Sequence, residues 1–277
     1  MTDYIVYNGS FHKNSTPLVS AGNRGLRYGD GLFDTLKFAD GKIHLDNWHF
    51  ERLFNGLRLL EFELPPYFTA VYLAGQVEAL CKKNQHKTAR VRINIFRGNG
   101  GLYNAENHFP NCIIESWQLP EVDFNLNENG LVTGIYKDAK KPMDRFSNLK
   151  SNNYLPYTMA ALYAKKQQWN DAFLLNAADR ICDATIANIF IIKNEVIYTS
   201  PLQEGCVAGI MRRLVLETLP AKGFNCQEKI ITEEDLFTAD EVFLTNSIKG
   251  IRWVGHCGAA SYTGRFVKVI FEKLLKK

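Results

Sequence analysis

Two segments of the chain have the composition of phosphate-binding loops. Gly205 and Gly209 bracket a stretch that leads directly into a predicted helix. A helix start offers free backbone N–H groups and a favourable dipole to an anion. Thr245-Asn246-Ser247 follows an apolar predicted strand and forms a second such loop. Because helix starts are common, each segment alone is a weak signal, and an ordinary turn is the alternative.

Covalent catalysis by a lysine is also open to this sequence. A lysine that forms a Schiff base needs an enclosed position and a pKa below its ordinary value. The chain contains 20 lysines, and composition alone does not select one. Lys150 is a candidate because small polar residues flank it between an extended segment and a predicted helix.

Other catalytic motifs are absent from the sequence. It contains no His-Glu-x-x-His pair, no Gly-x-Ser-x-Gly elbow and no phosphate loop of the Gly-x-x-x-x-Gly-Lys-Ser/Thr type. The segment Gly98–Tyr103 has Tyr103 where a dinucleotide-binding loop needs a glycine. The 6 cysteines include no Cys-x-x-Cys pair, so we expect reduced thiols and no metal site.

Composition places the chain among ordinary globular proteins. Its 277 residues are 46% hydrophobic and 22% charged, which excludes collagen-like, disordered and disulfide-scaffold classes. The net charge of +4 comes without long basic runs, so we expect no nucleic-acid partner. The chain shows neither a signal peptide nor an apolar stretch of about 20 residues, so we expect no membrane partner and a cytoplasmic location.

Hydrophobic periodicity predicts an α+β protein with two domains. In the first half it predicts strands at 5–9, 31–38, 42–45, 91–95 and 112–117, and helices at about 46–60 and 73–81. In the second half it predicts strands at 131–136, 172–176, 186–192, 195–199 and 241–245, and helices at 156–168, from 209 and at 266–274. Periodicity is lost at 118–128, which divides the chain into domains 1–119 and 126–277.

The predicted helix that follows residue 45 is amphipathic. Asp46 is its predicted N-cap, and Pro65-Pro66 must end it. His49, Arg52 and Gly56 project opposite the apolar stripe, so periodicity alone predicts a solvated face for them.

A series of motifs is similar to that of the class IV pyridoxal-phosphate enzymes. The motifs are Arg24-Gly25-Leu26-Arg27-Tyr28-Gly29-Asp30-Gly31-Leu32-Phe33-Asp34-Thr35, His49-Phe50-Glu51-Arg52-Leu53, Asn148-Leu149-Lys150, Ala187-Asn188-Ile189-Phe190, Gly209-Ile210-Met211-Arg212 and Asp240-Glu241-Val242-Phe243-Leu244-Thr245-Asn246. They occur in the order seen in branched-chain aminotransferases, D-amino-acid aminotransferases and 4-amino-4-deoxychorismate lyase. The resemblance spans residues 4 to about 255 and implies fold-type IV, with a smaller N-terminal α/β sandwich and a larger C-terminal barrel-like domain that binds pyridoxal 5′-phosphate.

The resemblance also implies roles for individual residues. Lys150 is identified as the lysine that binds the cofactor covalently and then moves the proton. Arg52 resembles the arginine that holds the cofactor phosphate, which replaces the solvated face predicted above. Ile210, Met211, Thr245 and Asn246 would complete the phosphate cup. A homodimer and a small amino-acid-like substrate are the implied partners.

Asp183 stands where the family has a glutamate, five residues before Asn188. A carboxylate at this position keeps the pyridine nitrogen of the cofactor protonated, which makes the ring an electron sink. Aspartate is one methylene shorter than glutamate, and the resemblance still identifies Asp183 as the partner of the nitrogen. An aspartate of an ordinary turn is the alternative.

Three hypotheses for the activity stay open. The first hypothesis is aminodeoxychorismate lyase, which eliminates pyruvate to give 4-aminobenzoate for folate biosynthesis. The pattern of this chain most resembles that enzyme at Phe33, at Thr35, which would be catalytic, and in the loop from Arg97 to Tyr103. Phe33, Arg97 and Tyr103 would then bind substrate, with Arg97 taking a carboxylate. A branched-chain or D-amino-acid aminotransferase is the second hypothesis, and a noncatalytic binding protein is the third.

Overall fold

The computed structural model describes residues 3–120 and 124–276 and separates into two compact units. Unit 1 comprises Met1–Asp123 with Lys150–Asn153, and unit 2 comprises Phe124–Leu149 with Tyr154–Lys277. The boundary predicted at 118–128 includes residues 121–123, which lie outside the described residues. Assigning Lys150–Asn153 to unit 1 differs from the uninterrupted second domain expected from the sequence.

Unit 1 is built on an antiparallel sheet, which has six strands among the described residues, in the order β2-β1-β6-β5-β3-β4. Its strands are β1 (Tyr4–Tyr7), β2 (Ser10–Lys13), β3 (Gly31–Ala39), β4 (Lys42–Ile43), β5 (Thr88–Arg97) and β6 (Pro110–Gln118). The predicted hairpin is confirmed, since Asp40 and Gly41, both with positive φ, join β3 to β4.

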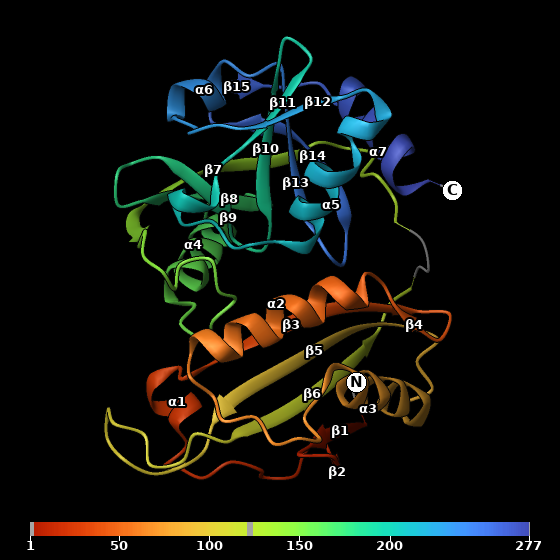
Figure 1. Cartoon of the computed structure of the whole chain (residues 1–277). Coiled ribbons are helices and arrows are strands. Elements are labelled where there is room, and N and C mark those ends of the chain that lie inside the picture. The colour runs from red at the N-terminus through yellow and green to blue at the C-terminus, as the bar shows by residue number, and fades with distance from the viewer. Residues whose placement is uncertain (1–2, 121–123, 277) are drawn as a thin grey trace. The chain divides into compact units, whose positions relative to one another are not determined.

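Two long helices cover one face of this sheet (Figure 1). They are α2 (Asp46–Leu59) and α3 (Ala70–Lys83), and a short α1 (Arg24–Tyr28) precedes β3. The side chains of Leu36, Leu57, Leu73 and Ile93 are fully buried between helices and sheet. Successive side chains of a strand alternate between the two faces, so Phe33, Thr35 and Lys37 lie on the face away from this core.

Unit 1 differs from the sequence prediction at three places. The strand predicted at 5–9 turns at Asn8 and Gly9 and returns as β2, which was not predicted. Helix α1 was also missed because it has only five residues. Asp46 is the first residue of α2 and not its N-cap, a position that Leu45 occupies in left-handed conformation.

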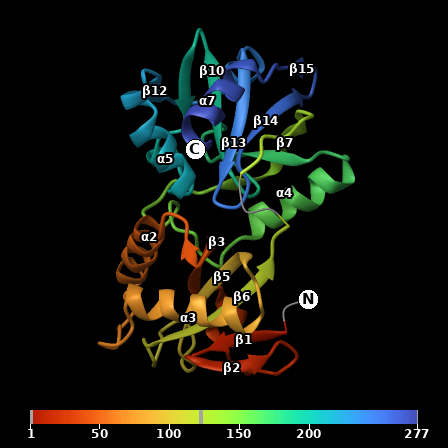
Figure 2. The same ribbon diagram turned by 90° about the vertical axis from the view of Figure 1, so that its right-hand side faces the viewer.

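Unit 2 contains a larger mixed sheet that curls into a half-barrel (Figure 2). Among the described residues its order is β12-β11-β10-β13-β14-β7-β8-β9, with β15 paired to β14. The strands are β7 (Leu131–Lys141), β8 (Asp171–Asn176), β9 (Ile181–Ala184), β10 (Asn188–Lys193), β11 (Val196–Thr199), β12 (Asn225–Glu228), β13 (Glu241–Asn246), β14 (Gly250–Cys257) and β15 (Ala260–Ser261). The α+β class and the barrel-like second unit predicted from the sequence are confirmed.

Helices pack on both sides of this sheet. They are α4 (Leu155–Lys166), η1 (Leu202–Glu204), α5 (Ile210–Thr218), η2 (Pro220–Lys222), α6 (Glu233–Phe237) and α7 (Arg265–Leu275). Helix α4 covers β7 and β8, whereas α5 and α7 contact β13. Strand β7 extends to Lys141 through a stretch that the sequence left unassigned. The strand predicted at 186–192 corresponds to β10, whereas β9 was not predicted. Among the described residues, no helix has the length and apolar character needed to cross a membrane.

A buried carboxylate joins α2 to β3 in unit 1. Asp34 is 1% exposed, and its Oδ1 lies 2.8 Å from Nη2 of Arg52 and 2.8 Å from Nδ1 of His49. Nε of Arg52 lies 3.2 Å from the second oxygen. His49 is also buried, so the solvated face predicted from periodicity is wrong. The reason is the ion pair with β3, which periodicity does not reveal.

The Asp34 cluster makes the stability of the protein sensitive to acid. Burial alone would raise the pKa of Asp34, but the charges and hydrogen bonds of Arg52 and His49 hold that pKa well below its ordinary value. A carboxyl whose pKa is depressed on folding stabilises the protein above its unfolded pKa, and this contribution is lost as the pH falls through the folded pKa.

We expect Asp34→Asn to lower the free energy of unfolding by about 3–5 kcal/mol at pH 7, because it leaves a largely buried arginine without its carboxylate. The difference from the unmodified protein should shrink as the pH is lowered from about 5 to about 2. Urea unfolding at several pH values measures both effects. Asp40→Asn, at an exposed turn, is the matched control and should change stability by less than about 0.5 kcal/mol. Equal losses in the two variants would contradict the assignment.

Candidate active site

The backbone around Lys150 is hydrogen-bonded to the first residues of β3. The backbone N–H of Phe33 donates to the carbonyl of Lys150 at 2.9 Å, and the N–H of Asn152 donates to Gly31 O at 3.0 Å. Nζ of Lys150 lies 4.8 Å from the centroid of the Phe33 ring. Strand β3 therefore holds both the backbone and the side chain of the predicted catalytic lysine within unit 1.

The Phe33 ring also contacts Arg92, a residue that the sequence did not single out. The guanidinium carbon of Arg92 lies 3.9 Å from the ring centroid. Arg92 pairs with Thr35 in the antiparallel register of β3 and β5, so the two side chains lie on the same face. The structure thus brings together the predicted residues Lys150 and Phe33, adds a cation at the same ring, and places Thr35 beside that cation. The signal in the sequence was the alternation of arginines with valine and isoleucine along β5.

Arg97 has a structural role in this unit. It is 7% exposed, and its Nε lies 3.1 Å from each carboxylate oxygen of Asp30. Its other nitrogens donate to the carbonyls of Leu60 and Glu61. Since each of its three nitrogens is already engaged, the predicted contact of Arg97 with a substrate carboxylate has no support in this geometry.

The loop after Arg97 is held by a second buried arginine. Arg24 donates to the carbonyls of Gly100, Leu102 and Tyr103 and pairs with Asp30 at 2.8 Å. The Tyr103 side chain, a predicted substrate contact, points outward with 90% of its surface exposed. Loop backbone is therefore fixed, while the side chain of Tyr103 stays accessible.

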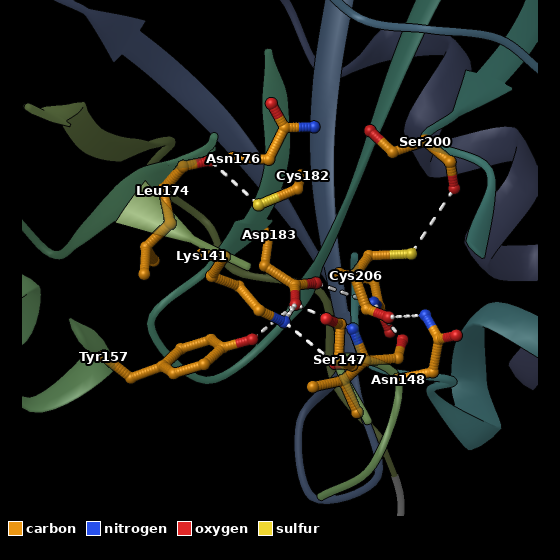
Figure 3. A network of polar contacts seen from close by, with 12 residues as sticks. Lys141, Ser147, Asn148, Tyr157, Leu174, Asn176, Cys182, Asp183, Ser200 and Cys206 are labelled. Atoms are coloured by element: carbon orange, nitrogen blue, oxygen red, sulfur yellow. Dashed lines mark hydrogen bonds and ion pairs between the residues drawn. The ribbon is translucent and has the colours of Figure 1, made fainter. Parts of the chain in front are cut away.

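Asp183 of unit 2 lies in a dense network of donors (Figure 3). Its side chain is 1% exposed. Oδ2 accepts from the Tyr157 hydroxyl at 2.7 Å, the Val207 N–H at 2.8 Å and Nζ of Lys141 at 3.3 Å. Oδ1 accepts from Nδ2 of Asn188 at 2.8 Å. The aspartate is thus fixed from four segments of the chain, which an aspartate of an ordinary turn would not need.

Asn188 connects Asp183 to the predicted phosphate cup within unit 2. Its Nδ2 also donates to Val207 O at 2.8 Å, and its register partner in the sheet is Thr245. A Cβ on Gly209 would lie 1.8 Å from Oδ1 of Asn188, so the chain needs glycine there. The carboxylate, the start of α5 and the end of β13 therefore lie around one asparagine.

These segments fit a bound phosphate. Gly209 is the N-cap of α5 and provides no side-chain acceptor for the first N–H groups of the helix, those of Ile210 and Met211. Thr245 Oγ1 is buried and finds no hydrogen-bond partner among the described residues. A phosphate would satisfy both kinds of donor. Asn246 instead uses its side chain to accept from the N–H groups of Ile248 and Lys249, which forms a turn.

Comparison with known proteins agrees with this geometry. A protein of Methanocaldococcus jannaschii named "Putative branched-chain-amino-acid aminotransferase" is 29% identical over 276 residues, covering 99% of this chain and 94% of its own. Aminodeoxychorismate lyase of Vibrio harveyi is 31% identical, covering 84% of this chain and 85% of its own. The solved structure of Escherichia coli branched-chain amino acid aminotransferase has a TM-score of 0.88 at 21% identity, covering 98% and 93% of the two chains.

The comparisons identify the fold and the family of this chain. The fold of the aminotransferase structure, fold-type IV, is the fold of this chain, as the sequence implied. The family model "Amino-transferase class IV" matches residues 31–257, which include both Lys150 and Asp183. The chain belongs to the class IV amino-transferase family of pyridoxal-phosphate-dependent enzymes.

Proposed function

We propose that the protein is an aminodeoxychorismate lyase. The observation that carries this proposal is the contact of Lys150 and Arg92 with the Phe33 ring, beside Thr35, the register partner of Arg92. Together these side chains offer an amine, a cation and a hydroxyl. A lyase of this kind acts on a substrate with carboxylates and must move protons close to the lysine. The Vibrio harveyi lyase supports the proposal at 31% identity.

The class IV resemblance and the geometry within each unit point to the residues that would hold pyridoxal 5′-phosphate. Thr245 and the backbone at Ile210 and Met211 would bind the phosphate, and Asp183 would pair with the ring nitrogen. The resemblance assigns the covalent link to Lys150 and a charge for the phosphate to Arg52, whose guanidinium is oriented by Asp34. When bound, the cofactor supplies an electron sink for the carbanion formed on the substrate.

The side chains around Phe33 would carry out the chemistry. We assign removal of the substrate proton to the amine of Lys150. Once released from the cofactor, this amine would stay next to the place where the substrate is bound. Arg92 would bind a substrate carboxylate and orient the ring, whose C–O bond to the enolpyruvyl group breaks. Thr35, on the same face, would donate its hydroxyl proton to the departing enolpyruvate, and the proton taken up by Lys150 would restore that hydroxyl. The products are pyruvate and an aromatic ring, 4-aminobenzoate, and aromatisation makes the step irreversible.

An amino-acid aminotransferase is the second candidate. It is supported by the Methanocaldococcus jannaschii relative, which matches 99% of this chain. Both activities need the same lysine, carboxylate and phosphate cup, so those residues do not separate them. Membership in an enzyme family favours either activity over the noncatalytic hypothesis. The homodimer and the cytoplasmic location stay predictions.

The reaction itself is tested with 4-amino-4-deoxychorismate. We expect the purified enzyme, loaded with pyridoxal 5′-phosphate, to release 4-aminobenzoate and pyruvate in equal amounts, measured by chromatography. A parallel incubation with amino acids and 2-oxoglutarate measures amino transfer. Brisk transfer without 4-aminobenzoate would overturn the lyase in favour of the aminotransferase.

Lys150→Ala should abolish covalent attachment of the cofactor, since attachment requires the amine at this position. Borohydride reduction followed by mass spectrometry of the peptides locates the attached group. Lys249→Ala, which removes an exposed lysine that follows the Thr245 loop, is the control and should retain the adduct on Lys150. An adduct that persists in the Lys150 variant would show that another lysine is used.

Arg92→Gln should raise KM for 4-amino-4-deoxychorismate by about 10- to 100-fold, the effect of losing a hydrogen bond to a charged group. Steady-state kinetics measures this, and kcat should change less than KM. Arg90→Gln removes an exposed arginine two residues earlier on the same strand and should leave KM near its original value. Similar KM changes in both variants would argue against a specific contact at Arg92.

A further inference from the structure

Lys141 is a buried lysine beside Asp183 that the proposed reaction does not use. It is 4% exposed and lies at the end of β7. Its Nζ is 3.3 Å from Asp183 Oδ2, 3.3 Å from the carbonyl of Ser147 and 4.9 Å from the centroid of the Tyr157 ring (Figure 3). Tyr157 in turn stacks on Tyr154 at 4.5 Å. The ammonium group therefore has a fixed place in the network.

A structural role alone does not require this charge. Burying a lysine has a large desolvation cost, and a buried ion pair is often replaced by apolar residues without loss of stability. Asp183 is already oriented by Tyr157, Asn188 and the Val207 N–H. A neutral side chain at position 141 would suffice to fill the space. The charge at this position therefore points to an electrostatic effect on Asp183.

The contacts of Asp183 leave one of its oxygens with more capacity than the other. A carboxylate has about four acceptor positions, two on each oxygen. Oδ2 receives three donors, of which Nζ of Lys141 at 3.3 Å is the most distant, and its positions are therefore filled. Oδ1 receives only Asn188 among the described residues. A further donor is therefore best accepted by Oδ1. Lys141 and a protonated ring nitrogen would then share the negative charge of one carboxylate from its two oxygens.

The other titratable groups around Asp183 are not cations. Burial, followed by the negative charge of Asp183, raises the pKa of Tyr157 and of Cys182. The same causes raise the pKa of Cys206 to about 12, and burial raises the pKa of Asp171. Among the described residues, Lys141 is thus the cationic side chain within hydrogen-bonding distance of Asp183.

We propose that Lys141 is a positioning residue that weakens the hold of Asp183 on the ring-nitrogen proton of the bound cofactor. Its charge offsets part of the carboxylate's charge, so the nitrogen is protonated less completely than it would be beside an unpaired carboxylate. This inference rests on the proposed role of Asp183 and adds that Lys141 adjusts how strongly Asp183 favours protonation of the ring nitrogen. It assigns a function to a lysine that has no part in the covalent chemistry proposed for Lys150.

The test uses holoenzyme loaded with pyridoxal 5′-phosphate labelled with ¹⁵N in the ring, whose NMR shift reports protonation of the nitrogen. Lys141→Gln keeps a donor but removes the charge, and should raise the pKa of the ring nitrogen by about one to two units, a 10- to 100-fold shift in the protonation equilibrium. Lys141→Arg keeps the charge and should restore the original shift. Lys141→Met serves as the neutral variant if the glutamine variant does not fold.

Tyr157→Phe is the matched control, because it removes a hydrogen bond to the same oxygen without changing the charge. It should move the ¹⁵N shift much less than Lys141→Gln does. An unchanged shift in the neutral variants, or equal changes in Lys141→Gln and Tyr157→Phe, would overturn the inference while leaving the role of Asp183 intact. A ring nitrogen that is insensitive to Asp183→Asn would instead overturn the proposed role of Asp183 itself.

Discussion

The buried carboxylate of Asp183 is the interaction on which the rest of unit 2 depends. One side chain ties together β7 through Lys141, α4 through Tyr157, β10 through Asn188 and the segment before α5 through Val207. Leaving such a group without its donors would cost more than most single contacts in the protein can return. The Val207 N–H and Asn188, which both hydrogen-bond to the carboxylate, therefore also fix the segment that leads into the start of α5.

In unit 1, a buried carboxylate likewise joins separate elements, and it belongs to Asp34. That carboxylate joins β3 to α2 by way of Arg52 and His49, and it lies on the core side of the strand. The residues on either side of it, Phe33 and Thr35, face the other way. The alternation of side chains along one strand thus separates a residue that fixes the scaffold from the two that we propose to contact substrate.

The sequence predicted much of the fold but only part of the site. Long periodic elements such as α2 and β5 were found because periodicity is strong over ten or more residues, whereas α1 and β2 are too short to show it. Motifs selected Lys150 and Asp183 as candidates, and their roles stay predictions. Arg92, Lys141 and Tyr157 could not be ranked, because their importance comes from contacts between segments far apart in the chain. Arg97 was selected from a motif as a substrate-binding residue, but its guanidinium donates to backbone carbonyls within unit 1.

The backbone pairing of Lys150–Asn153 with β3 has a consequence for the way the chain can be divided. The polypeptide leaves unit 1 after residue 123 and comes back for these four residues before it continues in unit 2. A fragment cut at the linker would therefore lack both the segment that pairs with the start of β3 and Lys150, the proposed covalent residue. Hybrid enzymes that exchange substrate-side halves between relatives must carry this short returning segment along with residues 3–120 if they are to assemble a working catalyst.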